Sequence, residues 1–418
     1  MRFCPKILGG RGNRALTVFS LCLLLLGFLA LPNPRPSLAN GPYTVNTTAD
    51  HTPDGCQQPP DGDCTLREAI GAAQACNTIV FNIPHTDPNY GYHTPGVWTI
   101  ILNSTLTGPS NDSVFVDGLQ PDTNPYGPEI EISGEALDSG KTCWILEGSL
   151  IRIEGLVINR CPASGILIEG RHDNHICGNY IGTDATGTTD QGVGVDGILL
   201  QSGAHDNTIG GSSEAHRNII SGNSRGIRIA GEDTTANVIQ GNYIGTDRTG
   251  TAPLGNDYGI QIDSTAHDNT IGPDNIIAYN DWYGVWVHGT DSTGNRITHN
   301  SIHSNRLEGI YLLLGGNNDL APPDLDTASC LSVGGTTSMP RPTVEVFSDA
   351  DGQGRFYEDG TLTWTDDFNF TFEPDSERLR GRMVTATATD SSGNTSPFSD
   401  PVHCGCPEIF LPLITKNY

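Results

Sequence analysis

The chain has 418 residues, with 22 Lys and Arg against 48 Asp and Glu, which gives a formal net charge of −26 at pH 7. This acidic balance argues against nucleic acid and anionic membranes as partners, since both attract clustered cations. It is compatible with Ca²⁺, neutral sugars and an acidic extracellular surface.

Residues 1–39 have the pattern of a signal peptide. Arg2, Lys6, Arg11 and Arg14 precede an apolar run over residues 15–31, and small residues suited to a signal peptidase follow. The run has about 17 residues, so a retained membrane anchor is the alternative interpretation. Cleavage would leave 17 basic against 48 acidic residues, a net charge of −31. The sequence therefore predicts a secreted, extracellular or cell-surface protein with no membrane span after signal removal, and it leaves the oligomeric state open.

Nine cysteines lie beyond residue 39, and an exported chain can form disulfides. Proximity along the chain predicts two pairs, Cys56–Cys64 and Cys161–Cys177. Cys330 would join one of the two cysteines that follow residue 403. The spacings do not match a zinc site, so we predict no metal here, and the odd count leaves at least one thiol outside these pairs.

Residues 40–78 contain one predicted helix. In Cys64-Thr65-Leu66-Arg67-Glu68-Ala69-Ile70 the apolar side chains, together with Ala73, fall on one helical face, and Asp63 is the candidate N-cap. Residues 79–81 then begin the first predicted strand. A short amphipathic helix suits the open apolar end of a repeat protein, because an uncovered end would promote aggregation.

A repeated motif organises the centre of the chain. It consists of Gly followed by alternating apolar residues, and its copies begin at Gly165, Gly197, Gly226, Gly259, Gly284 and Gly309, with steps of 32, 29, 33, 25 and 25 residues. A second motif, Asn-x-Ile, lies between the copies. Three short strands with period-2 alternation in each 25-residue repeat predict one turn of a parallel β-helix, with longer loops on some turns.

The residue types fit this geometry. The first and third apolar residues of a copy, such as Ile166 and Ile168, would point into the coil. Asn and Gly tolerate the backbone bend between sheets, and Asn at equivalent corners can form a hydrogen-bonded ladder from one turn to the next. An antiparallel β-sandwich is the alternative, but it has no reason to repeat both motifs in the same order. Residues 98–161 are interpreted as earlier, less regular turns.

Two stretches resemble known families. Residues 64–70 resemble the Cys-Ser-Leu-Arg-Glu-Ala domain at the N-terminus of exported bacterial β-helix proteins, with Thr65 in place of Ser. Residues 165–314 resemble the parallel β-helix repeats of the pectate-lyase-like superfamily, in which the loop Asn179–Thr188 and its copy Asn242–Thr251 look like a loop of exported members. The resemblance, with the crossover rule for parallel strands, implies a right-handed coil.

The predicted fold class is all-β. A right-handed parallel β-helix with three-strand rungs covers residues 79–316, with the capping helix before it. Residues 317–342, rich in Asn, Asp, Pro and Gly, are predicted to be a linker. Residues 343–403 are expected to form a small antiparallel β module, and residues 404–418 an apolar tail for docking or sorting, or a last edge strand.

The superfamily resemblance implies a fold more than an activity. Enzymes on this fold commonly cleave acidic polysaccharides, and the polygalacturonan hydrolases carry Asn-Thr-Asp, paired Asp and Gly-His-Gly motifs that this sequence lacks. A complete lyase set of Ca²⁺-binding carboxylates with an Arg or Lys base is not visible either. We therefore favour a structural or recognition role that involves polysaccharide or a cell-surface glycan. A polysaccharide lyase or glycoside hydrolase with a non-standard site is the alternative.

Outward side chains of the repeated motif supply the candidate site. One column contains Leu167, Leu199, Arg228, Gln261, Trp286 and Tyr311, and the next contains Glu169, Gln201, Ala230, Asp263, His288 and Leu313. Because strands stack about 4.8 Å apart, Arg228, Gln261, Trp286 and Tyr311 are expected to form a ligand-binding patch suited to a sugar. Asp263 and His288 are the candidate catalytic acid/base pair. An ordinary solvent-facing surface is the alternative.

The repeated loops Gly182-Thr183-Asp184 and Gly245-Thr246-Asp247 could bring two carboxylates together. A Ca²⁺ site would need about six oxygen ligands. A turn capped by its own Asp is the favoured interpretation, so we predict no cofactor, with Ca²⁺ as the alternative.

Overall fold

The computed structural model describes residues 42–51, 56, 62–119, 127–329, 332–350, 352–362, 367–371, 379 and 381–404. The predicted signal peptide and the apolar tail beyond Cys404 lie outside these residues. No helix in the described part of the chain has the length and apolar character needed to cross a membrane.

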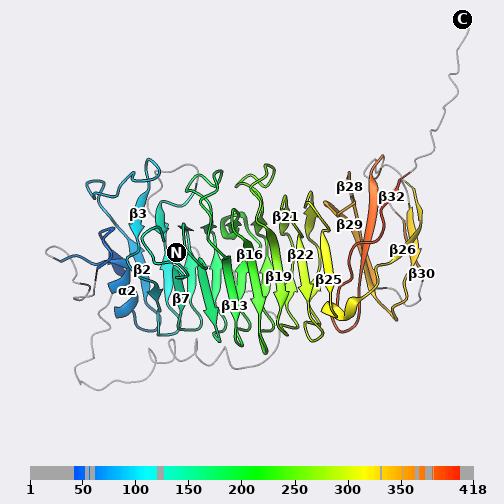
Figure 1. Cartoon of the computed structure of the whole chain (residues 1–418), viewed down its shortest axis with the longest axis horizontal. Helices are drawn as coiled ribbons and strands as arrows, with labels where there is room; N and C mark the ends of the chain where they lie inside the picture. Colours follow the sequence, from blue (N-terminus) through cyan, green and yellow to red (C-terminus); the bar gives the residue numbers. More distant parts are fainter. Residues whose placement is uncertain are drawn as a thin grey trace, which may run out of the picture. The chain divides into compact units, whose positions relative to one another are not determined.

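Three parallel sheets wind around one core and form the right-handed, three-strand-per-turn β-helix that the sequence predicts (Figure 1). Sheet A contains β1 (Tyr43–Val45), β2 (Thr78–Phe81), β5 (Phe115–Asp117), β8 (Arg152–Glu154), β11 (His175–Cys177), β14 (Thr208–Gly210), β17 (Val238–Gln240), β20 (Thr270–Ile271) and β23 (Arg296–Ile297). Sheet B contains β3 (Trp98–Ile101), β6 (Ile130–Ser133), β9 (Leu156–Asn159), β12 (Tyr180–Ile181), β15 (Ile219–Ile220), β18 (Tyr243–Ile244), β21 (Ile276–Ala278) and β24 (Ser301–His303). Sheet C contains β4 (Leu106–Thr107), β7 (Trp144–Leu146), β10 (Ile166–Glu169), β13 (Asp196–Gln201), β16 (Arg225–Ala230), β19 (Tyr258–Asp263), β22 (Val285–His288) and β25 (Ile310–Leu313).

The core follows from the alternation within each motif. On β10, Ile166 and Ile168 are fully buried, whereas Leu167 between them is partly exposed. Register is kept from turn to turn, since Ile166 pairs with Ile198 of β13 on one side and with Trp144 of β7 on the other. Equivalent apolar residues therefore stack in columns, and β-branched side chains suit this pleated, close-packed surface.

Asparagine ladders run along the corners between sheets, as predicted. The Asn174 side-chain amide donates to Asn207 Oδ1 at 2.9 Å, and the same contact recurs on later turns. The three ladders are Asn174–Asn207–Asn237–Asn269–Asn295, Asn179–Asn218–Asn242–Asn275–Asn300 and Asn223–Asn256–Asn280–Asn305. All of these side chains are buried. Each ladder satisfies polar groups that would otherwise destabilise the interior.

Helix α2 (Leu66–Ala72) lies at the end of the coil that carries β1 and β2 (Figure 1). Its side chains Leu66, Ala69 and Ile70 are buried in the same apolar cluster as the coil interior, which agrees with the predicted capping face. The predicted N-cap is wrong, because Thr65 rather than Asp63 caps the helix and forms a capping box with Glu68.

The first strand also differs from the prediction. Strand β1 precedes the helix and pairs in parallel with β2, so the coil begins before residue 79. A strand of three residues carries too little alternation to be recognised from the sequence alone.

Two antiparallel sheets follow the last turn of the coil. One contains β26 (Asp324–Ala328), β27 (Ser332–Thr336) and β30 (Asp367–Thr371), and the other contains β28 (Thr343–Asp349), β29 (Phe356–Leu362), β31 (Met383–Thr389) and β32 (Val402–His403). The small antiparallel module is confirmed, but the predicted linker at 317–342 is wrong. The short 3₁₀ helix η2 (Gly316–Asp319) and strands β26 and β27 occupy it. Its Asn, Asp and Gly content concealed two strands that are stabilised by pairing, β26 with β27 and β27 with β30.

The C-terminal module covers the last turn of the coil. Gln353 Oε1 accepts the backbone N–H of Asn305 at 2.9 Å, so it occupies the next place in the third asparagine ladder. Asn394 Oδ1 accepts the Gly294 N–H at 2.6 Å, and Phe398 packs against the coil's apolar core. Both ends of the core are thus closed by elements outside the repeats.

Two disulfides are present in the described part of the chain. Cys56 pairs with Cys64, as predicted, and Cys143 pairs with Cys161. The predicted pair of Cys161 with Cys177 is therefore wrong. Sequence proximity was misleading because stacking of turns brings Cys143, just before β7, to a Cα–Cα distance of 5.5 Å from Cys161, just after β9.

We expect Ile70→Asp to uncouple the helical cap from the coil. A buried, unpaired carboxylate at this position should lower the free energy of unfolding by about 3 kcal/mol or more and expose the core end. Chemical denaturation and size-exclusion chromatography would measure the loss of stability and the resulting aggregation. Gly71→Asp is the control, because a side chain there would point into open space. A monomeric Ile70→Asp protein with an unchanged Tm would refute the capping role.

Candidate functional site

The predicted outward column lies on sheet C in continuous register. Arg228 of β16 pairs with Gln261 of β19, Gln261 pairs with Trp286 of β22, and Trp286 pairs with Tyr311 of β25. Gln261 is buried, whereas Arg228, Trp286 and Tyr311 are partly exposed. The structure therefore brings all four predicted ligand-binding residues together on successive turns.

Asp263 is held by neighbours on two turns. Arg228 donates through Nε and Nη2 to its two carboxylate oxygens at 3.0 and 2.9 Å, and Gln261 and Ser264 donate to the same group. Burial alone would raise the pKa of Asp263, but these donors outweigh burial and hold the pKa below its ordinary value of 3.8. The hydrogen bond from Arg228 to this carboxylate in turn raises the pKa of the guanidinium.

His288 lies beside Trp286, with ring centroids 5.3 Å apart. Among the described residues, the side-chain partners of Asp263 are Arg228, Gln261 and Ser264. An ionised carboxylate engaged by a guanidinium is poorly suited to give or take a proton. The geometry therefore joins Asp263 to Arg228, and among the described residues His288 is not a hydrogen-bond partner of this carboxylate.

An aromatic platform extends the column. We use this name for Tyr258, Trp282, Tyr283, Trp286, His288 and Tyr311, which lie on strands β19, β22 and β25 or in the short segment before β22. Tyr258 stacks on Trp286 with centroids 5.2 Å apart and on Trp282 at 5.9 Å. Tyr283 stacks on Tyr311 at 4.3 Å. Trp282 is 48% exposed and the other five rings are partly exposed, so the platform keeps aromatic surface accessible to solvent.

Sequence reasoning missed half of this platform. Tyr258 comes directly before Gly259, and Trp282 and Tyr283 come directly before Gly284. The outward positions predicted from the sequence lie within the alternating motif, whereas these three rings precede its glycine. Aromatic residues at the same offset in two successive copies would have been the sequence pattern that indicated them.

The two Gly-Thr-Asp loops are closed by their own carboxylates. Asp184 Oδ1 accepts the N–H groups of Thr188 and Thr189, both at 3.1 Å. Asp247 Oδ1 accepts the hydroxyl of Thr249 at 2.7 Å and loop N–H groups. Burial would raise the pKa of Asp247, but these donors outweigh it and hold the pKa below its ordinary range. The arrangement is that of a capped turn.

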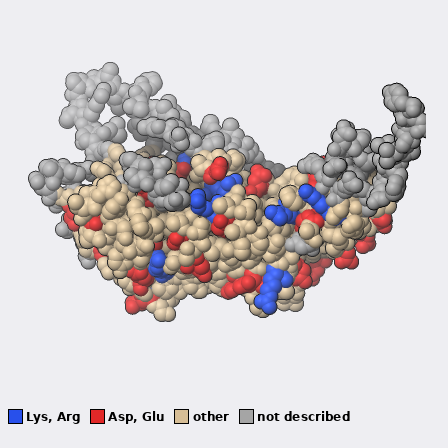
Figure 2. All heavy atoms as spheres, turned by 90° about the horizontal axis from the view of Figure 1, so that it is seen from above, with Lys and Arg blue, Asp and Glu red and all other residues tan. Residues whose placement is uncertain are grey.

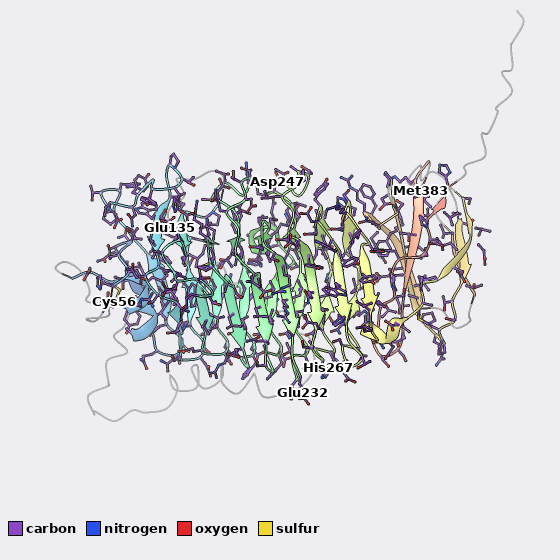
Figure 3. The ribbon with its side chains drawn as sticks, in the orientation of Figure 1. Cys56, Glu135, Glu232, Asp247, His267 and Met383 are labelled. Carbon is purple, nitrogen blue, oxygen red and sulfur yellow. A yellow bond between two sulfur atoms is a disulfide. The ribbon has the colours of Figure 1, made fainter. Side chains whose placement is uncertain are left out.

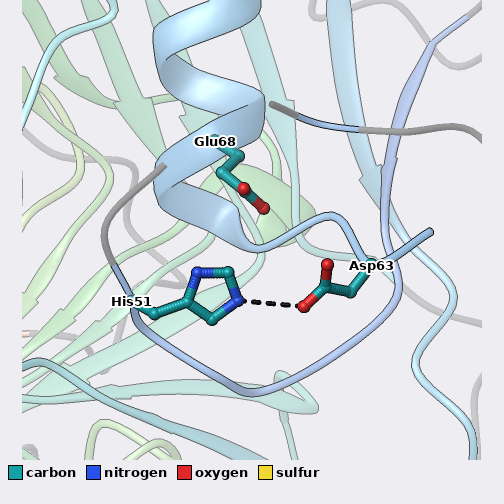
Figure 4. Close-up of side chains that lie close together, drawn as sticks. All are labelled: His51, Asp63 and Glu68. Atoms are coloured by element: carbon teal, nitrogen blue, oxygen red, sulfur yellow. Dashed lines mark hydrogen bonds and ion pairs between the residues drawn. The ribbon is translucent and has the colours of Figure 1, made fainter. Parts of the chain in front are cut away.

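One group of metal-ligand side chains lies near the helical cap. The nitrogen and oxygen atoms of His51, Asp63 and Glu68 lie within 4.8 Å of one another, and His51 Nε2 is 2.9 Å from Asp63 Oδ2 (Figure 4). Glu68, however, accepts the Thr65 N–H at 2.8 Å in the capping box. Its carboxylate is therefore a structural part of the helix N-terminus.

The acidic residues do not gather in one patch on the face that Figure 2 shows. Figure 2 shows Asp and Glu scattered over the visible face, with Lys and Arg in a few separate groups. The net charge of −26 makes the long-range field repulsive to polyanions.

Comparison with known proteins gives a partial family match. The model of a family described as periplasmic copper-binding protein (NosD) matches residues 128–320, a little under half of the chain. No curated protein matches the chain.

Three solved structures resemble the chain at low identity. Pectate lyase Pel9A is 14% identical, over 68% of this chain and 80% of that one, with a TM-score of 0.31. Tailspike protein 2 from Escherichia coli O157:H7 bacteriophage CAB120 is 11% identical, over 80% of this chain and 60% of that one, with a TM-score of 0.25. The Dettilon tailspike protein is 15% identical, over 78% and 82%, with a TM-score of 0.24. Each is a distant resemblance in fold.

The ion pair of Asp263 predicts a defined pH dependence. Because the folded-state pKa of Asp263 lies below its ordinary value of 3.8, the ionised group stabilises the fold at higher pH, and this contribution is lost as the pH falls below that value. Asp263→Asn should lower the free energy of unfolding by about 2 kcal/mol between pH 5 and 7, with the difference shrinking below about pH 4. Asp291→Asn, at an exposed position, is the control. A difference that grows as the pH falls would contradict the assignment.

Removal of divalent cations should leave the Gly-Thr-Asp loops intact. Their carboxylates already accept several loop N–H groups, so excess EDTA is expected to leave the Tm unchanged. Differential scanning calorimetry with EDTA and then with added Ca²⁺ makes the measurement. A fall in Tm that Ca²⁺ restores would show that the loops hold a bound cation.

Proposed function

We propose that this chain is an exported β-helix protein that binds a neutral polysaccharide or cell-surface glycan along the aromatic platform of sheet C. The observation that carries the proposal is the stacking of aromatic rings on successive turns of the coil. Sugar rings present apolar C–H faces that pack on aromatic faces, while neighbouring polar groups hydrogen-bond their hydroxyls.

The platform suits an extended chain rather than a single sugar. Turns of the coil recur about every 4.8 Å, so a glycan lying along the coil axis would meet new side chains at each turn. Polar groups lie beside the rings: Arg228 keeps 27% of its side chain exposed next to the buried Gln261 amide. The indole N–H of Trp286 is buried without a hydrogen-bond partner among the described residues. A rotation of that ring would offer this donor to a sugar hydroxyl.

The ionised, hydrogen-bonded state of the Asp263 carboxylate favours glycan binding over glycan cleavage as the function. Glycoside hydrolysis needs a protonated acid and a second carboxylate or activated water, and lyase chemistry needs a free base. Asp263 is instead kept ionised by Arg228, Gln261 and Ser264. The net negative charge further disfavours the acidic polysaccharides on which pectate-lyase-like enzymes act.

Three observations support an exported location. The first 39 residues have the pattern of a signal peptide. The two disulfides fit an oxidising compartment outside the cytosol. The partly matching family is described as periplasmic.

The resemblance of residues 64–70 to a Cys-Ser-Leu-Arg-Glu-Ala domain is part of the proposal, because each of these residue types has a task here. Cys64 forms a disulfide, and the box between Thr65 and Glu68 caps the helix. Arg67 binds Asp50 through Nε and Nη2 at 2.7 and 2.8 Å and also donates to two backbone carbonyls. Leu66 and Ala69 are buried in the core. A Ser at the position of Thr65 would serve equally as the N-cap.

Loss of a ring from the platform should weaken glycan binding without unfolding the chain. Trp282→Ala and Trp286→Ala should each reduce affinity by about 1–2 kcal/mol, roughly tenfold in Kd, through loss of stacking area. Retention on a panel of immobilised neutral and acidic polysaccharides measures this effect. Tyr92→Ala is the matched control, because Tyr92 is 54% exposed and lies outside the platform. Equal retention of all variants would refute the proposal.

The same panel tests the alternative function. We expect no new reducing ends and no unsaturated products from any polysaccharide. Products that disappear in Asp263→Asn and His288→Ala while binding persists would establish a lyase or hydrolase in place of the proposed binding protein.

A further inference from the structure

A His-Asp-Asn sequence recurs at the corner between sheets C and A, on an edge of the coil that neither the platform nor the Gly-Thr-Asp loops use. Its copies are His172-Asp173-Asn174, His205-Asp206-Asn207 and His267-Asp268-Asn269. Figure 3 shows His267 on the opposite edge of the coil from Asp247, with the acidic Glu232 nearby. In each copy the Asn belongs to the buried ladder, and the His and Asp side chains are partly exposed.

Each histidine is oriented by the aspartate that follows it. His172 Nδ1 is 3.0 Å from Asp173 Oδ2, His205 Nδ1 is 2.9 Å from Asp206 Oδ2, and the third copy repeats the contact at 3.0 Å. An ionised carboxylate can only accept, so Nδ1 carries the proton and the lone pair of the neutral ring is on Nε2. This carboxylate–histidine arrangement is the one that orients and strengthens metal-ligating imidazoles in proteins.

The first two copies are adjacent, and the third is isolated. His172 and His205 are paired in register, and their rings stack with centroids 4.9 Å apart and planes 15° apart. Their side chains are 43% and 42% exposed. His267 is instead paired in register with Thr235. The chain therefore contains one histidine pair and one single histidine in the same local setting.

The corner holds this pair rigidly. Asp173 and Asp206 take the same left-handed backbone conformation, with φ of 56° and 55°. The Asn174 side chain donates to Asn207 directly beneath them. Because the backbone of both corners is fixed, the two histidines stay on adjacent turns and only their side chains have to adjust when a ligand binds, which limits the entropic cost of binding.

We propose that His172 and His205 form a binding site for one divalent transition-metal ion, ligated by both Nε2 atoms and completed by water or by a partner's ligand. With bonds of about 2.0–2.1 Å, an ion such as Zn²⁺ joins two nitrogens up to roughly 4 Å apart. The two partly exposed rings would turn from their stacked arrangement so that the lone pairs of both Nε2 atoms converge on the ion. Two imidazole ligands bind ions that prefer nitrogen ligands, such as Zn²⁺, more tightly than Ca²⁺ and Mg²⁺, which prefer oxygen ligands. This site is independent of the proposed glycan platform.

Calorimetric titration of untagged mature protein with Zn²⁺ in millimolar Ca²⁺ tests the site. His172→Ala and His205→Ala should each weaken the tightest Zn²⁺ binding by about tenfold or more, because one imidazole cannot chelate alone. Asp206→Asn should weaken it by about tenfold through the loss of the orienting carboxylate. His267→Ala, the matched control from the isolated copy, should leave it unchanged.

A gain-of-function variant distinguishes the loss of a metal ligand from the loss of folded structure. Thr235→His completes the column between His205 and His267, so it should add a second bound ion or tighten binding. Unchanged Tm in the absence of metal verifies that each variant is folded. Equal losses in the His172, His205 and His267 variants would mean that single surface histidines bind the ion, and would overturn the proposal. Unchanged binding in His172→Ala and His205→Ala would overturn it as well.

Discussion

The buried asparagine ladder is the interaction on which the rest of this structure depends. An unpaired buried amide would cost about 1–3 kcal/mol, so every corner Asn must find its partner on the next turn. That requirement forces successive turns into one register, as the contact from Asn242 to Asn275 at 3.0 Å illustrates. Backbone pairing between parallel strands alone would tolerate slippage, whereas a ladder at each of three corners does not.

Because the register is fixed, side chains at equivalent positions of successive repeats lie next to one another and form continuous surfaces. Because Gln261 must lie over Trp286, residues 25 positions apart in sequence become neighbours on sheet C. The aromatic platform and the pair His172–His205 arise by this one mechanism on different sides of the coil. In each case the side chains are held by a scaffold that does not need to move when a ligand binds, which favours affinity.

The same repetition creates a need for the two end structures. Each turn buries its apolar residues only by contact with neighbouring turns, so the first and last turns must be covered by something else. At one end α2 places Leu66 and Ile70 in the core, and Arg67 fastens the helix to Asp50. At the other end Gln353 continues an asparagine ladder from outside the repeats. Stability is therefore expected to depend on both caps as well as on the coil.

The sequence by itself determined the coil, its inward columns and its ladders, because these follow from local alternation and from the equal spacing of Asn and Gly. It also predicted the Cys56–Cys64 disulfide and the buried face of the capping helix. Only the tertiary structure decided that Cys143 pairs with Cys161, that Asp263 joins Arg228, and that the rings before Gly259 and Gly284 complete the platform. These contacts depend on which residues of successive turns become neighbours and on the path that loops of different length take between strands. Neither feature can be read from the sequence of a single repeat.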